Sequence, residues 1–201
     1  FKFYADNGNA EAMAKLADFY HGLHGDEYKD NLKEVYWSLR ALEEGEPDGA
    51  SSIATCFTYG YAVNENPAFS RAWDARWCIE AAGKGWPVNE YPEFDSLSAA
   101  GYTKNDWKFL AASTYVSVPR YATQNEDSIV DAALLAVDLL NQKAGDFAVE
   151  MKVYKQDKAL AAAATQKTQG SFSTNLIPQA PQQAVAAQPK KKTNWLSAIG
   201  R

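Results

Sequence analysis

Apolar side chains recur at helical spacing in two parts of the chain before Gly85. Leu16 and Tyr20 are four residues apart, as are Ile53 and Phe57, so each pair lies on one stripe of an amphipathic helix. An alanine directly follows both Leu16 and Ile53. Because small side chains let two helices approach closely, the pattern predicts helices packed against one another.

Two tryptophans further along the chain have matching surroundings. Trp37 and Trp77 are each followed by alanine after four residues and by glycine after eight. The pattern predicts a second helix in each unit, with the indole between units and Gly45 or Gly85 in the left-handed conformation that commonly ends a helix. Gly8, Gly45 and Gly85 recur at an interval of roughly 40 residues, which is the length of two helices and two turns.

These positions resemble the Sel1-like repeat family, whose members are relatives of the tetratricopeptide repeats. The family's first helix reads roughly L-G-x-x-Y-x-x-G-x-G-V, and its second helix reads A-x-x-W-x-x-K-A-A-x-x-G. Residues 53–66 match the first-helix pattern with two substitutions, and residues 30–45 match the second. About four extra residues lie between Asn66 and Trp77. The resemblance covers about residues 3–85 and implies a short α/α solenoid of helix-turn-helix repeats.

The next part of the chain predicts further helices, so the fold class is all-α. The run from Trp86 to Pro92 is expected to be an extended connection, because residues before proline avoid the helical region. Thr123 and Glu126 form a capping-box pattern, and Gly145 is expected to stop a helix. The expected helices are 103–115, 125–143 and 146–165. We expect them to form a C-terminal helical cap on the solenoid, with a separate small helical bundle as the alternative.

Composition changes at residue 165. Residues 165–201 contain six glutamines and three prolines and few apolar anchors, which is typical of a disordered linker. Three lysines followed by an apolar group near its end predict a segment that docks onto a partner; these residues are Lys190, Lys191, Lys192, Trp195, Leu196 and Ile199. The predicted domains are repeats at 1–85, a cap or bundle at 86–164, and a basic tail at 165–201.

Charge divides the chain in the same place. Residues 1–164 hold 15 basic and 25 acidic residues, a net charge of −10, whereas residues 165–201 carry +5. An acidic body repels phosphates, so we expect no specific nucleic-acid binding by the body. The longest clean apolar stretches are six residues, which is far too short for a transmembrane helix.

Candidate chemistry is sparse. His21 and His24 lie near two carboxylates, but they fall where the repeat needs only a turn, so we expect a solvated turn and no metal. Cys56 and Cys78 are expected to be free thiols in the core, although some secreted relatives of this repeat join such helices by a disulfide. The sequence has no nucleophile elbow, P-loop or dinucleotide-binding glycine motif, so we expect no catalysis and no cofactor.

The resemblance implies a non-catalytic adaptor that binds a protein partner on the first helices of its repeats. Five residues lie off the core stripe of those helices and are the expected contacts: Asp18, His21, Thr55, Thr58 and Tyr59. The alternative is a structural subunit of a larger assembly, such as a cell-envelope machine or a virion, whose tail threads between neighbours. A secreted or periplasmic location and a cytoplasmic one both stay open.

Overall fold

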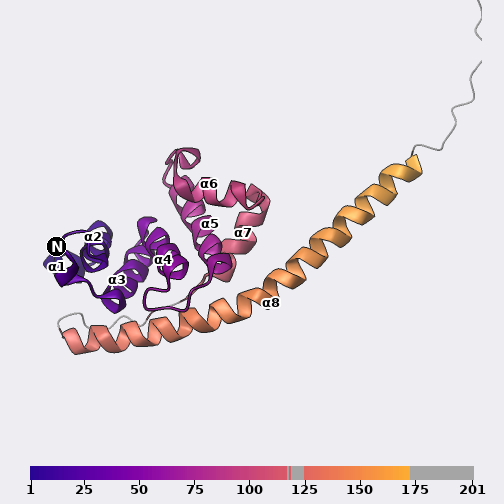
Figure 1. The fold of residues 1–201 in the computed structure, drawn as a ribbon. Coiled ribbons are helices and arrows are strands. Elements are labelled where there is room, and N and C mark those ends of the chain that lie inside the picture. Colours follow the sequence, from indigo (N-terminus) through magenta and orange to yellow (C-terminus); the bar gives the residue numbers. More distant parts are fainter. Residues whose placement is uncertain (117, 119–124, 173–201) are drawn as a thin grey trace, which may run out of the picture. The chain divides into compact units, whose positions relative to one another are not determined.

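The computed structural model describes residues 1–116, 118 and 125–172, with side chains up to residue 166 (Figure 1). Within these ranges the chain folds into helices joined by turns, without a β-strand, so the predicted all-α class is confirmed. The helices are α1 (Lys2–Asp6), α2 (Ala10–His21), η1 (Asp26–Tyr28), α3 (Asn31–Glu43), α4 (Asp48–Tyr59), α5 (Pro67–Gly83), η2 (Val88–Glu90), α6 (Pro92–Ala99), α7 (Lys104–Ser113) and α8 (Glu126–Phe172).

Consecutive helices pack in pairs. Helix α2 lies against α3 and α4 against α5, while α3 also contacts α4 (Figure 1). Helices α6 and α7 both pack on α5. Residues 1–156 form one compact unit and residues 157–201 a second. The predicted division at residues 85 and 164 stays a prediction.

Polar residues fix where the paired helices begin. The side chains of Asn9, Asp30 and Asn66 each accept a hydrogen bond from the backbone N–H three residues later, at 2.7, 3.1 and 3.0 Å. These bonds satisfy N–H groups that have no partner inside the helix. At the other end, Gly45 and Gly85 have φ of +86° and +81°, which confirms their predicted left-handed conformation.

Helices α3 and α5 are equivalent in register. Their last residues, Glu43 and Gly83, have the same separation along the chain as Trp37 and Trp77, and both tryptophans are only 1% exposed. Helix α5 is longer than α3, with 17 residues against 13, and the extra residues before Trp77 form one additional turn at its start. Because one turn is about 3.6 residues, the addition leaves the buried face of α5 in register with that of α3.

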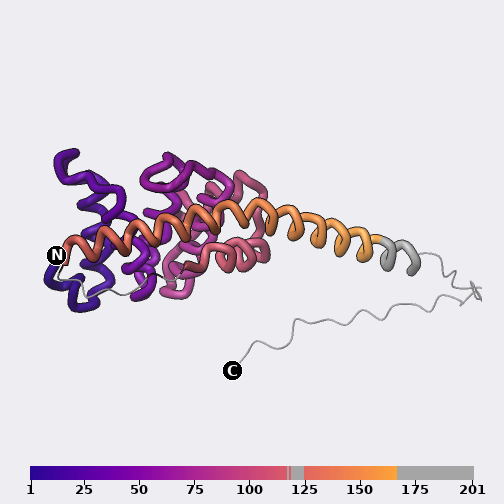
Figure 2. The backbone as a smooth tube through the Cα atoms, turned by 90° about the horizontal axis from the view of Figure 1, so that it is seen from below, coloured from indigo at the N-terminus to yellow at the C-terminus, as the bar shows by residue number. Residues whose placement is uncertain are grey.

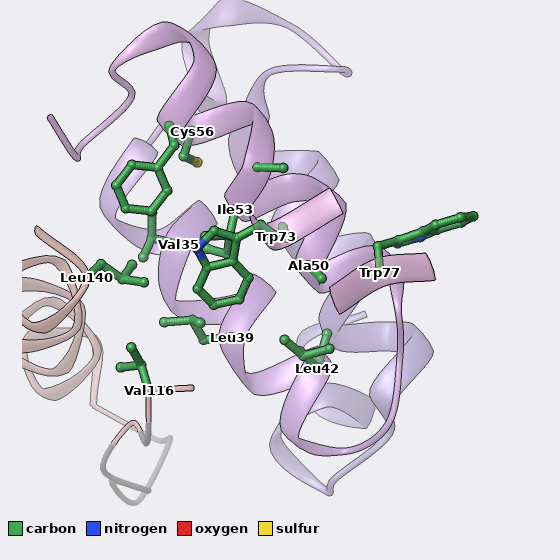
Figure 3. Close-up of a cluster of buried hydrophobic side chains, with 14 of the residues drawn as sticks. Val35, Leu39, Leu42, Ala50, Ile53, Cys56, Trp73, Trp77, Val116 and Leu140 are labelled. Atoms are coloured by element: carbon green, nitrogen blue, oxygen red, sulfur yellow. The ribbon is translucent and has the colours of Figure 1, made fainter. Parts of the chain in front are cut away.

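The core lies between the helix pairs and α8. Figure 3 shows buried side chains from α3, α4, α5, α8 and the segment that follows α7: Val35, Leu39, Leu42, Ala50, Ile53, Cys56, Trp73, Trp77, Val116 and Leu140. Helices α3 and α4 approach so closely that a Cβ on Gly49 would lie 2.1 Å from the carbonyl oxygen of Ser38. Only glycine therefore fits at position 49 without a shift of one helix.

The first part of α8 covers the stack along one side. Residues 126–154 run past α3, α5 and α7 (Figure 2). Phe147 packs against Phe69 at 5.2 Å between ring centroids, and Tyr154 stacks on Phe109 at 4.1 Å. The apolar stripe of this helix is buried: Ile129, Ala133, Ala136, Val137 and Leu140. Leu160, further along the same helix, is 69% exposed.

Gly145 does not stop a helix, and this prediction was wrong. Helix α8 is continuous from Glu126 to Phe172, beyond the predicted end at residue 165. Ala144 and Phe147 are buried on either side of Gly145, and their packing outweighs the penalty of about 1 kcal/mol for a helical glycine. At the start of the helix, Asn125 accepts a hydrogen bond from the N–H of Asp127 at 3.1 Å, whereas Thr123 lies outside the described residues.

The prediction for residues 86–92 was correct only in part. Tyr91 is extended, with φ of −117° and ψ of 150°, as expected for a residue before proline. Pro92, however, is the first residue of α6, a helix that the sequence analysis missed. Proline suits this position because the N–H it lacks would have no helical partner there. Helix α7 confirms the helix expected at 103–115 and has a capping box between Thr103 and Asp106.

In the part of the chain that the structure describes, no helix combines the length and apolar character needed to cross a membrane.

Candidate functional site

Two adjoining cavities lie along α2, α4 and α6. The first has a volume of about 300 Å³ and is lined by Asp18, His21, Leu23, Glu34, Asp48, Ser51, Ser52 and Thr55. The second, of about 440 Å³, is lined by Ser51, Ala54, Thr55, Thr58, Tyr59, Pro67, Ser70, Arg71, Asp74, Pro92, Glu93 and Ser96. Ser51 and Thr55 belong to both, so the two cavities share a wall on α4. We call the surface that contains them the polar face.

All five body residues expected to contact a partner line the polar face. Asp18 and His21 line the first cavity, Thr58 and Tyr59 line the second, and Thr55 lies in their shared wall. The structure therefore brings together residues of two helices that the whole of α3 separates in the sequence. Partner binding by these residues stays a prediction.

The threonines on this face are held by their own helix. Thr55 donates its hydroxyl to the carbonyl oxygen of Ser51 at 3.1 Å, and Thr58 donates to that of Ala54 at 3.0 Å. Thr58 also lies 2.8 Å from the hydroxyl of Ser70 on α5. These bonds fix the side chains of the shared wall, so the shape of the polar face depends on α4 and α5 together.

A buried carboxylate, Glu34 on α3, lines the first cavity and was missed by the sequence analysis. It is only 1% exposed. Its Oε1 lies 2.8 Å from Nδ1 of His21 and 3.6 Å from Sγ of Cys56. Its Oε2 is also buried and makes no hydrogen bond within the described part of the chain.

Burial controls the protonation of this group. Loss of solvent raises the pKa of Glu34, and the hydrogen bond with His21 acts in the opposite direction. Burial also raises the pKa of the Cys56 thiol well above its usual value, and the charge of Glu34 adds to the effect. Cys56 is therefore protonated at neutral pH and donates its S–H to Glu34.

A second buried carboxylate, Asp74 on α5, lines the second cavity. It is 8% exposed and accepts a hydrogen bond of 2.7 Å from the hydroxyl of Ser96 on α6. Burial raises its pKa to about 6, against the opposing effect of the Ser96 bond. Nearby, Ser51 donates to Oε1 of Glu93 at 2.6 Å, while Oε2 of Glu93 is buried without a partner among the described residues.

Glu34 and Asp74 occupy equivalent positions. Each lies three residues before its buried tryptophan, and each receives a hydrogen bond from a residue 22 positions later on the next helix, Cys56 or Ser96. The signal that could have found them is this shared spacing from Trp37 and Trp77, because it places one acidic residue at the same point of two otherwise buried helix faces.

The structure also places the cysteines and the histidines. Cys56 and Cys78 are both buried free thiols, so the expectation of free core cysteines is confirmed over the disulfide. The expected solvated turn was wrong for His21, which is the last residue of α2, half-buried and 2.8 Å from Glu34, whereas the ring of His24 lies 6.1 Å from that of Phe19. Across the described residues, no group of three or more metal-ligating side chains is suitably arranged to hold an ion.

The six predicted docking residues of the tail lie outside the described residues: Lys190, Lys191, Lys192, Trp195, Leu196 and Ile199. Their docking role stays a prediction.

Comparison of the chain with models of known protein families, with curated proteins and with solved structures finds no match. In the part of the chain that the structure describes, the fold is all-helical, with the polar face along α2, α4 and α6.

Proposed function

We propose that this protein is a non-catalytic adaptor that binds a protein partner on its polar face. The observation that carries the proposal is the pair of adjoining cavities across α2, α4 and α6. Two separate side-chain pockets on one surface suit an extended segment of a partner, because alternate side chains of such a segment can enter successive pockets.

The arrangement of the helices supports the same proposal. The pairs α2/α3 and α4/α5 follow one another, and their second helices share a register in which Trp37 corresponds to Trp77. This arrangement agrees with the Sel1-like resemblance, which we retain as part of the proposal. In stacked helix pairs of this kind, one surface is built by the first helix of every pair and serves for binding.

Exposure of one aromatic side chain adds to this support. Tyr59 lines the second cavity and is 64% exposed, with its ring stacked on that of Tyr61 at 5.6 Å. Tyrosine is enriched in protein interfaces because it combines a large apolar surface with a hydroxyl that bonds to water or to a partner.

Site-specific photocrosslinking tests this function. A photoreactive phenylalanine analogue at position 59 should form adducts with a partner protein in cells, whereas the same analogue at exposed Val149 on α8 should not. Thr55→Arg places a long side chain at the wall that the two cavities share and should abolish the adducts. Val149→Arg adds the same charge elsewhere and should leave them unchanged.

Two outcomes would contradict the proposal. Equal adducts at positions 59 and 149 would show that the polar face has no special role. Adducts that survive Thr55→Arg but disappear when residues 173–201 are deleted would favour the tail-threading structural subunit instead.

A further inference from the structure

Oε2 of Glu34 is an unusual polar atom of the polar face. It is buried, it belongs to a residue that lines the first cavity, and it makes no hydrogen bond within the described residues. A buried carboxylate oxygen without a donor is costly, and native structures rarely retain one without a reason. A donor supplied from outside the chain would remove this cost.

The hydroxyl groups around Glu34 do not supply that donor, because each is already donating. Ser51 donates to Glu93 at 2.6 Å, Ser52 to the carbonyl oxygen of Asp48 at 3.2 Å, and Thr55 to that of Ser51 at 3.1 Å. Their free lone pairs can only accept. These three hydroxyls therefore offer only acceptors to whatever enters the first cavity.

The charged groups of the first cavity also favour a ligand that donates hydrogen bonds. Asp18 and Asp48 line the cavity together with Glu34, and within the described part of the chain no lysine or arginine lines it. Asp18 lies 3.4 Å from the ammonium of Lys15 in a solvent-exposed pair, and Asp48 accepts a bond of 3.3 Å from the Trp77 indole. An anionic ligand would be repelled by these carboxylates, while a cationic donor would be attracted.

We propose that the first cavity binds the charged end of a lysine or arginine side chain from the partner segment, with Oε2 of Glu34 as its principal acceptor. This inference rests on the function proposed above and specifies the chemistry of the partner. Ammonium and guanidinium groups are donors only, which complements a cavity of acceptors. A cavity of about 300 Å³ equals the volume of about ten water molecules, which leaves room for one long side chain.

Peptide selection on the full-length protein tests the inference. A random dodecamer phage library is selected on the wild-type chain, and binding of the enriched peptides is measured by fluorescence anisotropy. Enriched peptides should share one lysine or arginine. Glu34→Gln, which keeps the size of the side chain, should weaken binding about 10- to 100-fold, because a hydrogen bond between two charged groups is lost.

Three further variants complete the design. Asp18→Asn, on a half-buried residue of the same cavity, should weaken binding less than Glu34→Gln and guards against a folding defect in the latter. Glu11→Gln changes an exposed acidic residue of α2 outside the cavity and should leave the affinity unchanged. Thr55→Arg should abolish binding, because the longer side chain at the shared wall would block the cavities.

The outcomes separate the inference from the proposed function. Peptides that are blocked by Thr55→Arg but lack a basic residue, or that bind wild type and both Glu34→Gln and Asp18→Asn equally, would overturn the inference and leave the adaptor function standing. Failure to enrich any peptide that Thr55→Arg blocks would overturn both. A shared basic residue with loss of affinity in Glu34→Gln, but not in Glu11→Gln, is the predicted result.

Discussion

Glu34 and Asp74 are two carboxylates at the same point of two equivalent helices, yet their surroundings differ. Glu34 lies between an imidazole and a thiol and keeps one oxygen without a partner among the described residues. Asp74 accepts a hydrogen bond from the hydroxyl of Ser96, and the neighbouring carboxylate of Glu93 raises the pKa of Asp74 further. In both pairs the carboxylate lies on the second helix, α3 or α5.

Part of the difference comes from the helix that follows each carboxylate. Helix α4 presents Cys56 to Glu34, while α6 presents Ser96 and Glu93 to the region of Asp74. Helices α3 and α5 therefore set where each buried carboxylate lies and burial raises its pKa, while the neighbouring helices supply its hydrogen-bond partners.

The largest expected effect tests whether the two helices are equivalent. Trp37→Ala and Trp77→Ala should each lower the free energy of unfolding by about 3 to 5 kcal/mol, because each removes a buried indole. Trp86→Ala should cost much less, since Trp86 is only half-buried beside Trp77. Urea denaturation midpoints measure all three. A small loss at either Trp37 or Trp77 would break the equivalence.

The next effect concerns the pH dependence of stability. Burial raises the pKa of Asp74 from 3.8 to about 6, so the folded state resists its ionisation. This group favours folding fully below pH 3.8, and the contribution is lost as the pH rises through about 6. Asp74→Asn cannot ionise and should therefore stabilise the protein by roughly 2 to 3 kcal/mol at about pH 7.5 relative to wild type, but hardly at all at about pH 3.5.

Asp95→Asn, an exposed change on α6, is the matched control and should show no such trend. Glu34→Gln should change stability in the same direction as Asp74→Asn, because burial also raises the pKa of Glu34. Urea titrations at several pH values measure these differences. A stability gain for Asp74→Asn that is equal under acidic and neutral conditions would show that Asp74 is not a buried, destabilised charge.

A smaller effect tests how closely α3 and α4 approach one another. Gly49→Ala should cost about 1 to 3 kcal/mol, because its Cβ would meet the backbone of Ser38. Gly83→Ala, where a Cβ would meet nothing within 4 Å, should be neutral or stabilising by up to about 1 kcal/mol. Thermal melting measures both variants. Equal effects would mean that α3 and α4 tolerate a wider separation.

Local rules predicted most of the fold. Helical spacing of apolar residues located the paired helices, and Gly45 and Gly85 ended helices as expected because their φ is positive. The same rule failed at Gly145, where packing of Ala144 and Phe147 keeps α8 continuous. Helix α6 was missed because Pro92 was interpreted as part of an extended connection when it begins a helix.

The candidate site was predicted in part for a similar reason. Residues off the core stripe of α2 and α4 must face away from the core, so Asp18, His21, Thr55, Thr58 and Tyr59 meet on one surface. Glu34 and Asp74 were missed because they lie on helix faces that are otherwise buried. The sequence marks them as acidic, but only the packing of α4 and α6 places a thiol and a hydroxyl against them.

The central claim is that the polar face is the surface that binds a partner. A backbone amide NMR titration of the full-length protein with a peptide selected as above measures this directly. The account predicts that the largest shifts occur in Ser51–Tyr59 of α4 and in neighbouring residues of α2 and α6. Shifts confined to the exposed side of α8, around Val149 and Val153, would contradict it.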